Sequence, residues 1–379
     1  MNIFFLGAGF SQPAGLPLGN ELFPKVLDAA KIKGLYEKKL EYAIFECLEY
    51  YHAVTGKKIT DDEISLEEFI SYLDISRHLL LEGGDYTAPE EEFKNLIAYV
   101  LHHHESRISK DQFALYEKFA EQLSLDDIVF TFNYDTVLEK ALARKNIPYR
   151  YYPFRLKYDD RDGSLLIDWK EEVIIHKMHG SINWFDKSYY RDWKNSWLER
   201  GFDGEPPFIV FDGSMEGDVH RLLDEPYKQS DSLRNIFIVD NLERYFRIYF
   251  EAKNRLVSDS PLIIAPSHHK MVNLSYLSEF WNGFSNVIIG ANKIIIIGFS
   301  LPAHDEYIRQ PLYWYIKHFH SHGESISGKK SNLKIVDFKT NQMEIDKFKE
   351  NYRFVDEQKT DYYFDGFNEG AIDFIFSND

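Results

Sequence analysis

Short, nearly continuous apolar runs recur along the chain and end in small or polar residues. They lie at Ile3–Leu6, Ile128–Phe132, Val173–Met178, Leu262–Ala265, Ile294–Ile297 and Leu333–Val336. Runs of this kind are typical of strands in a parallel sheet whose two faces are both covered. Helical patterns lie between them, and this alternation predicts an α/β fold with a doubly wound, mostly parallel, Rossmann-like sheet.

The first two predicted strands are separated by a long stretch of helix formers. Leu35–Tyr51, Glu63–Leu81 and Glu90–Leu123 place apolar residues three and four apart, as one face of a helix requires. Because this stretch is too long for a simple crossover, we expect a helical insertion at residues 35–124 and the α/β domain at 1–34 and 125–379. Within that domain, residues 181–231 are rich in tryptophan and turn residues, which predicts a loop-rich aromatic excursion.

The chain is long enough to form a sizeable core, but its charge restricts its partners. It has 379 residues, of which 44% are hydrophobic, and a formal charge of −17. Binding to DNA or to anionic lipid needs a basic face, so we expect this chain by itself to bind neither nucleic acid nor a membrane. A small anion held by backbone groups is compatible with the charge.

The cysteine content and the apolar segments bear on the compartment. A single cysteine, Cys47, cannot form an intramolecular disulfide or a cysteine-based zinc site. Met1–Leu6 lacks the basic start of a signal peptide, and the most apolar stretch, Val287–Phe299, is interrupted by Asn292 and Lys293 and is too short for a membrane span. These features indicate a cytoplasmic protein.

A glycine-containing turn directly follows the first predicted strand. It reads Gly7-Ala8-Gly9-Phe10-Ser11 and leads to a helix that we expect to begin near residues 18–21. Glycines let a phosphate approach the backbone closely, and turn amides and a helix dipole favour its negative charge. These five residues are therefore candidates for binding a nucleotide pyrophosphate, and a tight strand-to-helix turn is the structural alternative.

The turn departs from the fingerprint of ordinary dinucleotide-binding dehydrogenases. That fingerprint needs a third glycine where this chain has Gln12, and an acidic residue after a second strand, whereas Asp28 lies in a helical pattern. Serine hydrolase chemistry is also disfavoured. Both 9–13 (GFSQP) and 298–302 (GFSLP) end in proline where a nucleophile elbow has glycine.

Three further motifs follow predicted strands. Asn133 and Asp135 follow the second strand, His179 follows the third, and Gly298 and Ser300 follow Ile294–Ile297. Ligands of open α/β sheets collect beyond the carboxyl ends of strands, so these residues are candidates for a nucleotide site. His179, expected at this edge rather than in the core, could act as general base, although single histidines are often structural. Helix capping is the alternative for Asn133 and Asp135.

Two histidine clusters are weaker candidates. His102, His103 and His104 are consecutive in a helical pattern, so their side chains diverge by about 100° per residue and cannot meet on one metal ion. We expect them on a solvated helix face. His268 and His269 follow another predicted strand end and could line the pocket.

Taken in order, the motifs GAGFSQPAGLP, TFNYDT, HGSINW and IGFSLP resemble the sirtuin-like family, specifically its bacterial NAD-hydrolysing branch found in anti-phage defence. The resemblance spans roughly residues 1–34 and 125–340. It implies a phosphate loop at Gly7, Ala8, Gly9 and Ser11, ribose and carboxamide contacts at Asn133 and Asp135, a catalytic base at His179, and a nucleotide contact at Gly298 and Ser300.

Two departures separate this chain from protein deacetylases of that family. Those enzymes carry a four-cysteine zinc module after the HG motif, whereas this chain has only Cys47, so we expect no zinc. They continue with an Asp-Phe-Arg segment where this chain reads Leu18-Gly19-Asn20. Acyl-peptide recognition is therefore not supported.

The resemblance implies an NAD glycohydrolase, which cleaves NAD to ADP-ribose and nicotinamide, as a regulated effector of bacterial anti-phage defence. It also implies gating, by oligomerisation or by a partner, for which we expect an ATPase of the HerA translocase type. The apolar stripes of the 35–124 insertion favour a homo-oligomer. Two alternatives stay open: an NAD or ADP-ribose sensor without turnover, and a protein deacylase or ADP-ribosyltransferase.

Overall fold

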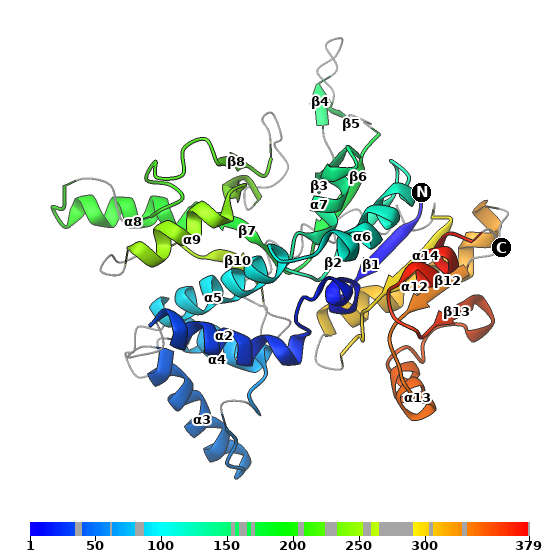
Figure 1. The fold of residues 1–379 in the computed structure, drawn as a ribbon, viewed down its shortest axis with the longest axis horizontal. Helices are drawn as coiled ribbons and strands as arrows, with labels where there is room; N and C mark the ends of the chain where they lie inside the picture. Colours follow the sequence, from blue (N-terminus) through cyan, green and yellow to red (C-terminus); the bar gives the residue numbers. More distant parts are fainter. Residues whose placement is uncertain are drawn as a thin grey trace. The chain divides into compact units, whose positions relative to one another are not determined.

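The computed structural model (Figure 1) divides into two compact units, neither of them continuous in sequence. The first comprises Met1–Leu18, His104–His179 and Lys270–Asp379, and the second comprises Gly19–His103 and Gly180–His269. The structure describes residues 1–34, 40–60, 63–79, 87–152, 156–158, 165–167, 171–203, 208–223, 233–252, 259–264, 291–302, 306–327 and 332–377.

A seven-stranded parallel sheet forms the centre of the first unit. Its order is β13-β12-β11-β1-β2-β6-β3, and every pair of neighbours is parallel. The strands are β1 (Ile3–Leu6), β2 (Ile128–Thr131), β3 (Tyr149–Tyr151), β6 (Val173–Lys177), β11 (Lys293–Ile297), β12 (Asn332–Val336) and β13 (Thr360–Tyr363). Every residue of β1, β2, β6 and β12 is buried, as parallel strands covered on both faces require. The predicted fold class is confirmed.

One row of paired residues marks the carboxyl edge of this sheet. Ile297, Leu6, Thr131 and Lys177 are successive partners across β11, β1, β2 and β6. Because the strands are parallel, the segments that follow these four residues all leave the sheet at the same edge. Four motifs from distant parts of the chain therefore start at one level, as the sequence predicted.

Helices surround the sheet of the first unit (Figure 1). They are α1 (Ala8–Ser11), α6 (Lys110–Gln122), α7 (Val137–Arg144), α12 (Glu306–Ser327), α13 (Gln342–Asn351) and α14 (Glu369–Phe376), with the 3-10 turns η1 (Gln12–Ala14) and η7 (Glu357–Lys359) and a hairpin of β4 (Leu156–Tyr158) and β5 (Leu165–Ile167). The Phe119 ring on α6 lies 5.7 Å from Phe4, 5.3 Å from Phe10 and 5.8 Å from Phe376. These edge and tilted ring contacts hold α6, α14 and the turn after β1 in one apolar cluster.

The second unit combines helices with a four-stranded antiparallel sheet of order β10-β7-β9-β8. Its elements are α2 (Gly19–Lys33), α3 (Glu41–Thr55), α4 (Leu66–Leu79), α5 (Thr87–Glu105), β7 (Gly180–Asp186), α8 (Ser188–Glu199), β8 (Val219–Arg221), η5 (Leu233–Asn235), β9 (Ile236–Val239), α9 (Leu242–Glu251) and β10 (Pro261–Ile263). The last two residues of α5 belong to the first unit. None of the described helices combines the length and apolar character needed to cross a bilayer.

One predicted strand lies in a different sheet from the one expected. The run Leu262–Ala265 predicts a parallel strand, but β10 pairs antiparallel with β7 in the second unit, and Ala265 lies outside the described residues. Gly180 permits this pairing, because a Cβ there would lie 1.9 Å from the Leu262 carbonyl oxygen. A short apolar run fits any covered strand, and contacts across the chain set its partner and direction. The prediction for this run is wrong.

The boundaries of the two compact units differ from the predicted domain boundaries. The described parts of the predicted insertion at residues 35–124 are mainly helical. However, α2 before it belongs to the second unit, and α6 at its end packs on α7 and α14 in the first. The segment at 181–231, predicted to be loop-rich, carries β7, α8 and β8. The functional domain boundaries stay a prediction.

The three consecutive histidines at the end of α5 have separate partners. His102 Nε2 lies 3.4 Å from Glu243, the His103 ring stacks 5.7 Å from Tyr99, and His104 Nδ1 lies 2.8 Å from the Gly15 carbonyl oxygen. All three side chains are half-buried. The helix face that they occupy is therefore partly solvated, and the expected divergence of the three rings is confirmed.

A buried carboxyl group in the second unit has a raised proton affinity. Asp259, just before β10, is 3% exposed, and it accepts the Val210 N–H at 2.7 Å. Its backbone oxygen accepts the Asn95 side-chain amide at 2.7 Å. Burial raises the pKa of Asp259 to about 8, with a smaller contribution from the charge of Asp212. The folded chain therefore keeps a proton that an unfolded aspartate loses near pH 4.

The stability of the chain is expected to fall as the pH rises from 5 to 8, because unfolding then releases the Asp259 proton. Asp259→Asn removes the titrating group. The melting temperature of this variant should therefore fall less steeply between pH 5 and pH 8 than that of the unmodified chain, whatever the melting temperature of the variant at pH 5. Asp203→Asn, at an exposed position, is the control and should follow the unmodified chain. Equal pH slopes for Asp259→Asn and the unmodified chain would contradict this.

Candidate active site

The turns after β1 and β11 pack backbone against backbone. The Gly7 N–H donates to the Ile297 carbonyl at 2.9 Å, and the Gly9 N–H donates to the Gly298 carbonyl at 3.0 Å. A Cβ on Gly298 would lie 2.4 Å from Gly9 Cα, and a Cβ on Gly9 would lie 2.7 Å from Gly298 Cα. Gly298 also has a φ of +61°, which favours glycine. The contact between the two turns therefore requires these glycines.

This contact bears on the predicted phosphate loop, Gly7–Ser11. The N–H groups of Gly7 and Gly9 are bonded across the turns, and the Phe10 N–H donates to the Gly7 carbonyl at 2.9 Å. The strand-to-helix turn, left open as the structural alternative, thus accounts for both glycines. A pyrophosphate bound here needs donors other than these three N–H groups, and its contact with Gly7–Ser11 stays a prediction.

Two buried tyrosines hold these turns in place. The Tyr116 hydroxyl on α6 donates to the Phe10 carbonyl at 2.9 Å and accepts the Ala14 N–H at 3.0 Å. The Tyr352 hydroxyl, directly after α13, donates to the Phe299 carbonyl at 2.6 Å. Nothing in the sequence marks these two among the chain's 25 tyrosines.

Asn133 is fixed in orientation at the carboxyl end of β2. The Asn133 Nδ2 donates to the Gly7 carbonyl at 2.9 Å and to the Ser11 Oγ at 3.2 Å. Asn133 as a whole is 8% exposed. Both amide protons are thereby used, which leaves Oδ1 as the free end of the side chain. Within the described part of the chain, Oδ1 accepts no hydrogen bond. The site therefore presents a neutral, rigid acceptor.

Helix capping, the structural alternative for Asn133 and Asp135, holds for neither in the strict sense, because the N-cap of α7 is Thr136. Asp135 Oδ1 accepts the Val137 N–H at 3.1 Å at the start of α7, and its carboxylate also accepts the Ser11 hydroxyl. Burial raises the pKa of Asp135 to about 6; the nearby charge of Lys177 lowers it and that of Glu105 raises it. A contact between Asp135 and a carboxamide stays a prediction.

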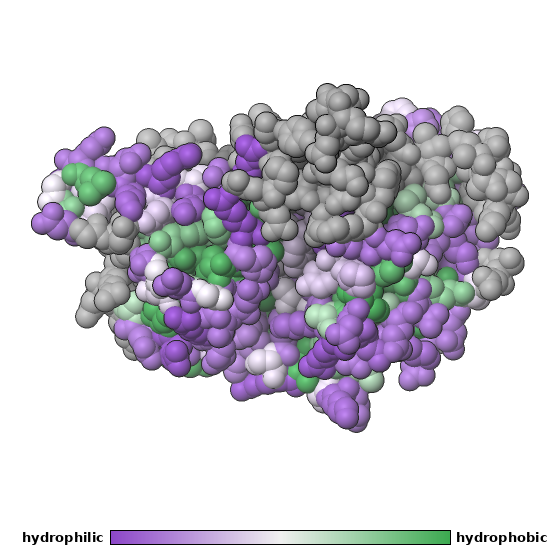
Figure 2. Space-filling model, turned by 90° about the horizontal axis from the view of Figure 1, so that it is seen from above, coloured by the Kyte–Doolittle hydropathy of each residue, from purple (hydrophilic) through white to green (hydrophobic). Residues whose placement is uncertain are grey.

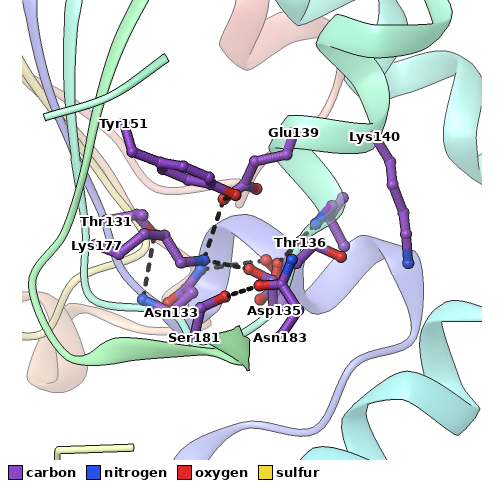
Figure 3. Close-up of polar contacts among 12 residues, drawn as sticks. Thr131, Asn133, Asp135, Thr136, Glu139, Lys140, Tyr151, Lys177, Ser181 and Asn183 are labelled. Atoms are coloured by element: carbon purple, nitrogen blue, oxygen red, sulfur yellow. Dashed lines mark hydrogen bonds and ion pairs between the residues drawn. The ribbon is translucent and has the colours of Figure 1, made fainter. Parts of the chain in front are cut away.

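A buried lysine lies beneath this turn (Figure 3). Lys177, the last residue of β6, donates to the Asp135 carbonyl oxygen and pairs with Glu139 on α7 at 3.3 Å. The Lys177 side chain is 0% exposed and that of Glu139 is 5% exposed, so the ion pair is almost entirely removed from water. A lysine buried in this way needs its partners to stay charged, because desolvation opposes the ammonium form.

A second buried carboxylate holds the other side of the same turn. Glu105, at the end of α5, accepts the Thr136 N–H at 2.6 Å and pairs with Lys140 on α7. Its side chain is 0% exposed, whereas that of Lys140 is 42% exposed. Neither Glu105 nor Lys177 is recognisable from the sequence, because charged residues at the ends of helices and strands usually lie on the surface.

His179 and Asn133 occupy equivalent positions on neighbouring strands, each two residues beyond the paired ends of β6 and β2. The His179 ring lies 5.5 Å from the ring of Phe132 and 6.2 Å from that of Tyr134, the residues on either side of Asn133. His179 is 3% exposed, so the expectation that it lies outside the core is wrong. The structure nevertheless brings it beside the Asn133 segment.

Ser300 lies beside a cavity of about 370 Å³ at the ends of β11 and β12. The other lining residues are Phe338, Lys339, Glu344, Lys347, Phe348 and Asn351. Asn351 Nδ2 donates to the Ser300 carbonyl at 2.9 Å. Cationic and aromatic side chains suit part of a nucleotide, and the cavity has the size of a small ligand site. His268 and His269 lie outside the described residues.

Metal ligands do not gather in the described residues. No group of three or more histidine, cysteine, aspartate or glutamate side chains is arranged there to hold a metal ion. Cys47 lies buried on α3, where burial raises its pKa to about 12 and so opposes the thiolate form that binds metals.

The model of the SIR2-like domain family matches residues 127–196 of the chain. The matched segment contains β2, Asn133, Asp135, β6 and His179, and it excludes the turns after β1 and β11. No curated protein matches the chain. The match supports a sirtuin-like relationship and an NAD-related function, and it specifies no reaction.

Replacing Gly298 by alanine is expected to destabilise the chain by more than its backbone angle alone accounts for. A positive φ costs roughly 1 kcal/mol for alanine, and the clash with Gly9 adds about 1–3 kcal/mol because two backbones must separate. Gly217→Ala is the control, since Gly217 has a φ of +87° and no atom within 4 Å of an added Cβ. An equal loss of unfolding free energy in the two variants, measured by urea unfolding, would contradict the role of this contact in stability.

Proposed function

We propose that this chain is an NAD glycohydrolase, which cleaves NAD to ADP-ribose and nicotinamide. The observation that carries the proposal is the placing of Asn133 and His179 at equivalent positions on neighbouring parallel strands, with the Asn133 amide locked so that Oδ1 is an acceptor. The match of the SIR2-like domain family to the segment that contains both residues supports it.

The reaction breaks the bond between the ribose anomeric carbon and the nicotinamide nitrogen, and a water oxygen forms the new bond to that carbon. The transition state has oxocarbenium character, so the ribose must be held in a fixed position while the ring becomes planar. Asn133 Oδ1 would accept a hydrogen bond from a ribose hydroxyl or from the attacking water. His179 would accept the water proton, directly or through a ribose hydroxyl.

The rest of the nucleotide would extend along the carboxyl edge of the first unit's sheet. The turn at Gly7–Ser11 follows β1, which is paired directly with β2, and Gly298 and Ser300 follow β11 on its other side. A dinucleotide with its ribose at Asn133 would place its pyrophosphate near the first turn and its other nucleoside toward the cavity beside Ser300.

We propose further that the enzyme is a cytoplasmic, regulated effector of bacterial anti-phage defence that acts as a homo-oligomer and takes a HerA-type ATPase as partner. Uncontrolled NAD cleavage would harm the cell, and assembly would supply the control. Exposed apolar side chains on α3 support an interface between copies: Tyr42 and Phe45 are each 55% exposed, and Val54 is 66% exposed. Figure 2 shows hydrophobic patches among the hydrophilic surface.

Incubation of the purified chain with NAD, followed by chromatography, is expected to yield free ADP-ribose and nicotinamide in equal amounts. Asn133→Asp should abolish cleavage, because an aspartate of nearly the same shape cannot donate to the Gly7 carbonyl and Ser11 Oγ. His179→Gln should slow cleavage by about 100- to 10,000-fold, the usual contribution of a general base. His220→Gln, on an exposed histidine, should leave the rate unchanged.

The products discriminate among the proposed function and its alternatives. Bound but unchanged NAD would favour a sensor, and ribose linked to protein or to an acyl group would favour a transferase or deacylase. Because His179 is buried, each variant should also be checked for an unchanged melting profile. A folded His179→Gln variant with near-normal turnover would exclude this histidine as the base.

Light scattering at micromolar concentration is expected to show a species of several times 44.7 kDa, the mass of one chain. Phe45→Glu should reduce that mass, because a charge in an apolar interface must be desolvated. Met343→Glu, on an apolar side chain that is 76% exposed on α13, is the matched control and should leave it unchanged. A monomer with full cleavage activity would contradict both the interface and its role in control.

A further inference from the structure

Glu105 is a buried carboxylate that the proposed reaction does not use directly. Its Oε1 accepts the Thr136 N–H at 2.6 Å, its Oε2 accepts the Thr136 hydroxyl at 3.0 Å, and its side chain is 0% exposed. Thr136 is the N-cap of α7 and closes the turn that begins at Asn133. Glu105 therefore ties the end of α5 to the turn that carries the proposed site.

The Asp135 carboxylate lies in the electrostatic field of several elements. It is faced by Lys177 from β6, Glu105 from α5, Ser11 from α1, Tyr116 from α6 and the Val137 N–H from α7. Lys177 favours the ionised carboxylate, but it also pairs with Glu139, so its charge is shared. The negative charge of Glu105 opposes ionisation.

A chain of hydrogen bonds joins this carboxylate to Asn133. Asn133 Nδ2 donates to Ser11 Oγ, and the Ser11 hydroxyl has one proton, which it donates to ionised Asp135. If Asp135 is protonated, it becomes the donor toward Ser11, and the Ser11 proton needs another acceptor. The ionised state thus satisfies every member of the chain, whereas protonation reverses the hydrogen bond between Ser11 and Asp135 and leaves the Ser11 proton without its acceptor in a buried site.

We propose that Glu105 is a positioning residue for the proposed NAD cleavage: it holds the turn before α7 and governs whether Asp135 accepts the Ser11 hydroxyl that anchors Asn133. This inference rests on the proposed function for its kinetic readout. Glu105 would act in two separable ways, through its hydrogen bonds to Thr136 and through its charge near Asp135.

Glu105→Gln and Glu105→Ala separate the effect of the Glu105 charge from that of its hydrogen bonds to Thr136. Glutamine keeps an oxygen that can accept the Thr136 N–H but removes the charge, so Asp135 should ionise more readily. The acid limb of the pH profile of kcat should move to lower pH by about half a unit or more. Alanine removes the hydrogen bonds as well, so kcat should fall at every pH, with a smaller change in KM.

Glu117→Gln is the matched control. Glu117 also pairs with basic residues on and next to α7, Arg144 at 3.5 Å and Lys145 at 4.0 Å, but it is not among the groups that shift the pKa of Asp135. Its pH profile should coincide with that of the unmodified chain. A common shift in both glutamine variants would reflect the loss of net negative charge and would overturn the specific role of Glu105.

A second readout does not depend on NAD cleavage. The carboxyl carbon of Asp135, labelled with 13C in aspartate and assigned by its absence in Asp135→Asn, should titrate at lower pH in Glu105→Gln than in the unmodified chain. An unchanged titration would overturn the inference. If the chain binds but does not cleave NAD, the proposed function fails while this titration still decides the influence of Glu105 on Asp135.

Discussion

The contact between the Gly9 and Gly298 backbones is the constraint on which the proposed site depends. The two turns approach so closely that neither position has room for a Cβ, and the Gly9 N–H donates to the Gly298 carbonyl at 3.0 Å. This contact fixes the turn after β1, whose Gly7 carbonyl then accepts the side-chain amide of Asn133. Through these bonds the ends of β11, β1 and β2 form one rigid edge.

Buried charge is the second determinant of this edge. Three carboxylates, Glu105, Asp135 and Glu139, lie at or near one turn, with Lys177 buried among them and Lys140 half exposed. Apolar residues of similar size would often give a more stable core than a buried ion pair. Such a cluster instead fixes the turn through directional bonds to the Asp135 carbonyl and the Thr136 N–H, which apolar packing cannot supply.

The sequence predicted the positions of the candidate residues better than it predicted their contacts. Asn133 and His179 could be found because each directly follows a recognisable apolar run. The glycines of 7–11 could be found as well, but the pattern could not tell a phosphate from a second backbone as the reason for them. The roles of Tyr116 and Tyr352 could not be predicted, because each depends on a hydroxyl that reaches a carbonyl far away in sequence, at Phe10 and Phe299.

Local sequence patterns were enough to predict five of the seven strands of the parallel sheet, the α/β class and the meeting of four motifs at one sheet edge, because burial on both faces leaves a continuous run of apolar residues. The strands β3 and β13 were not predicted. Tertiary structure alone decided that the run near Leu262 joins an antiparallel sheet. It alone also decided that His179 is buried, and that Asp135 rather than Asn133 accepts the Val137 N–H at the start of α7. Strand partners, burial of a polar side chain and the proton affinity of a carboxyl group arise from contacts across the chain, which no local pattern records.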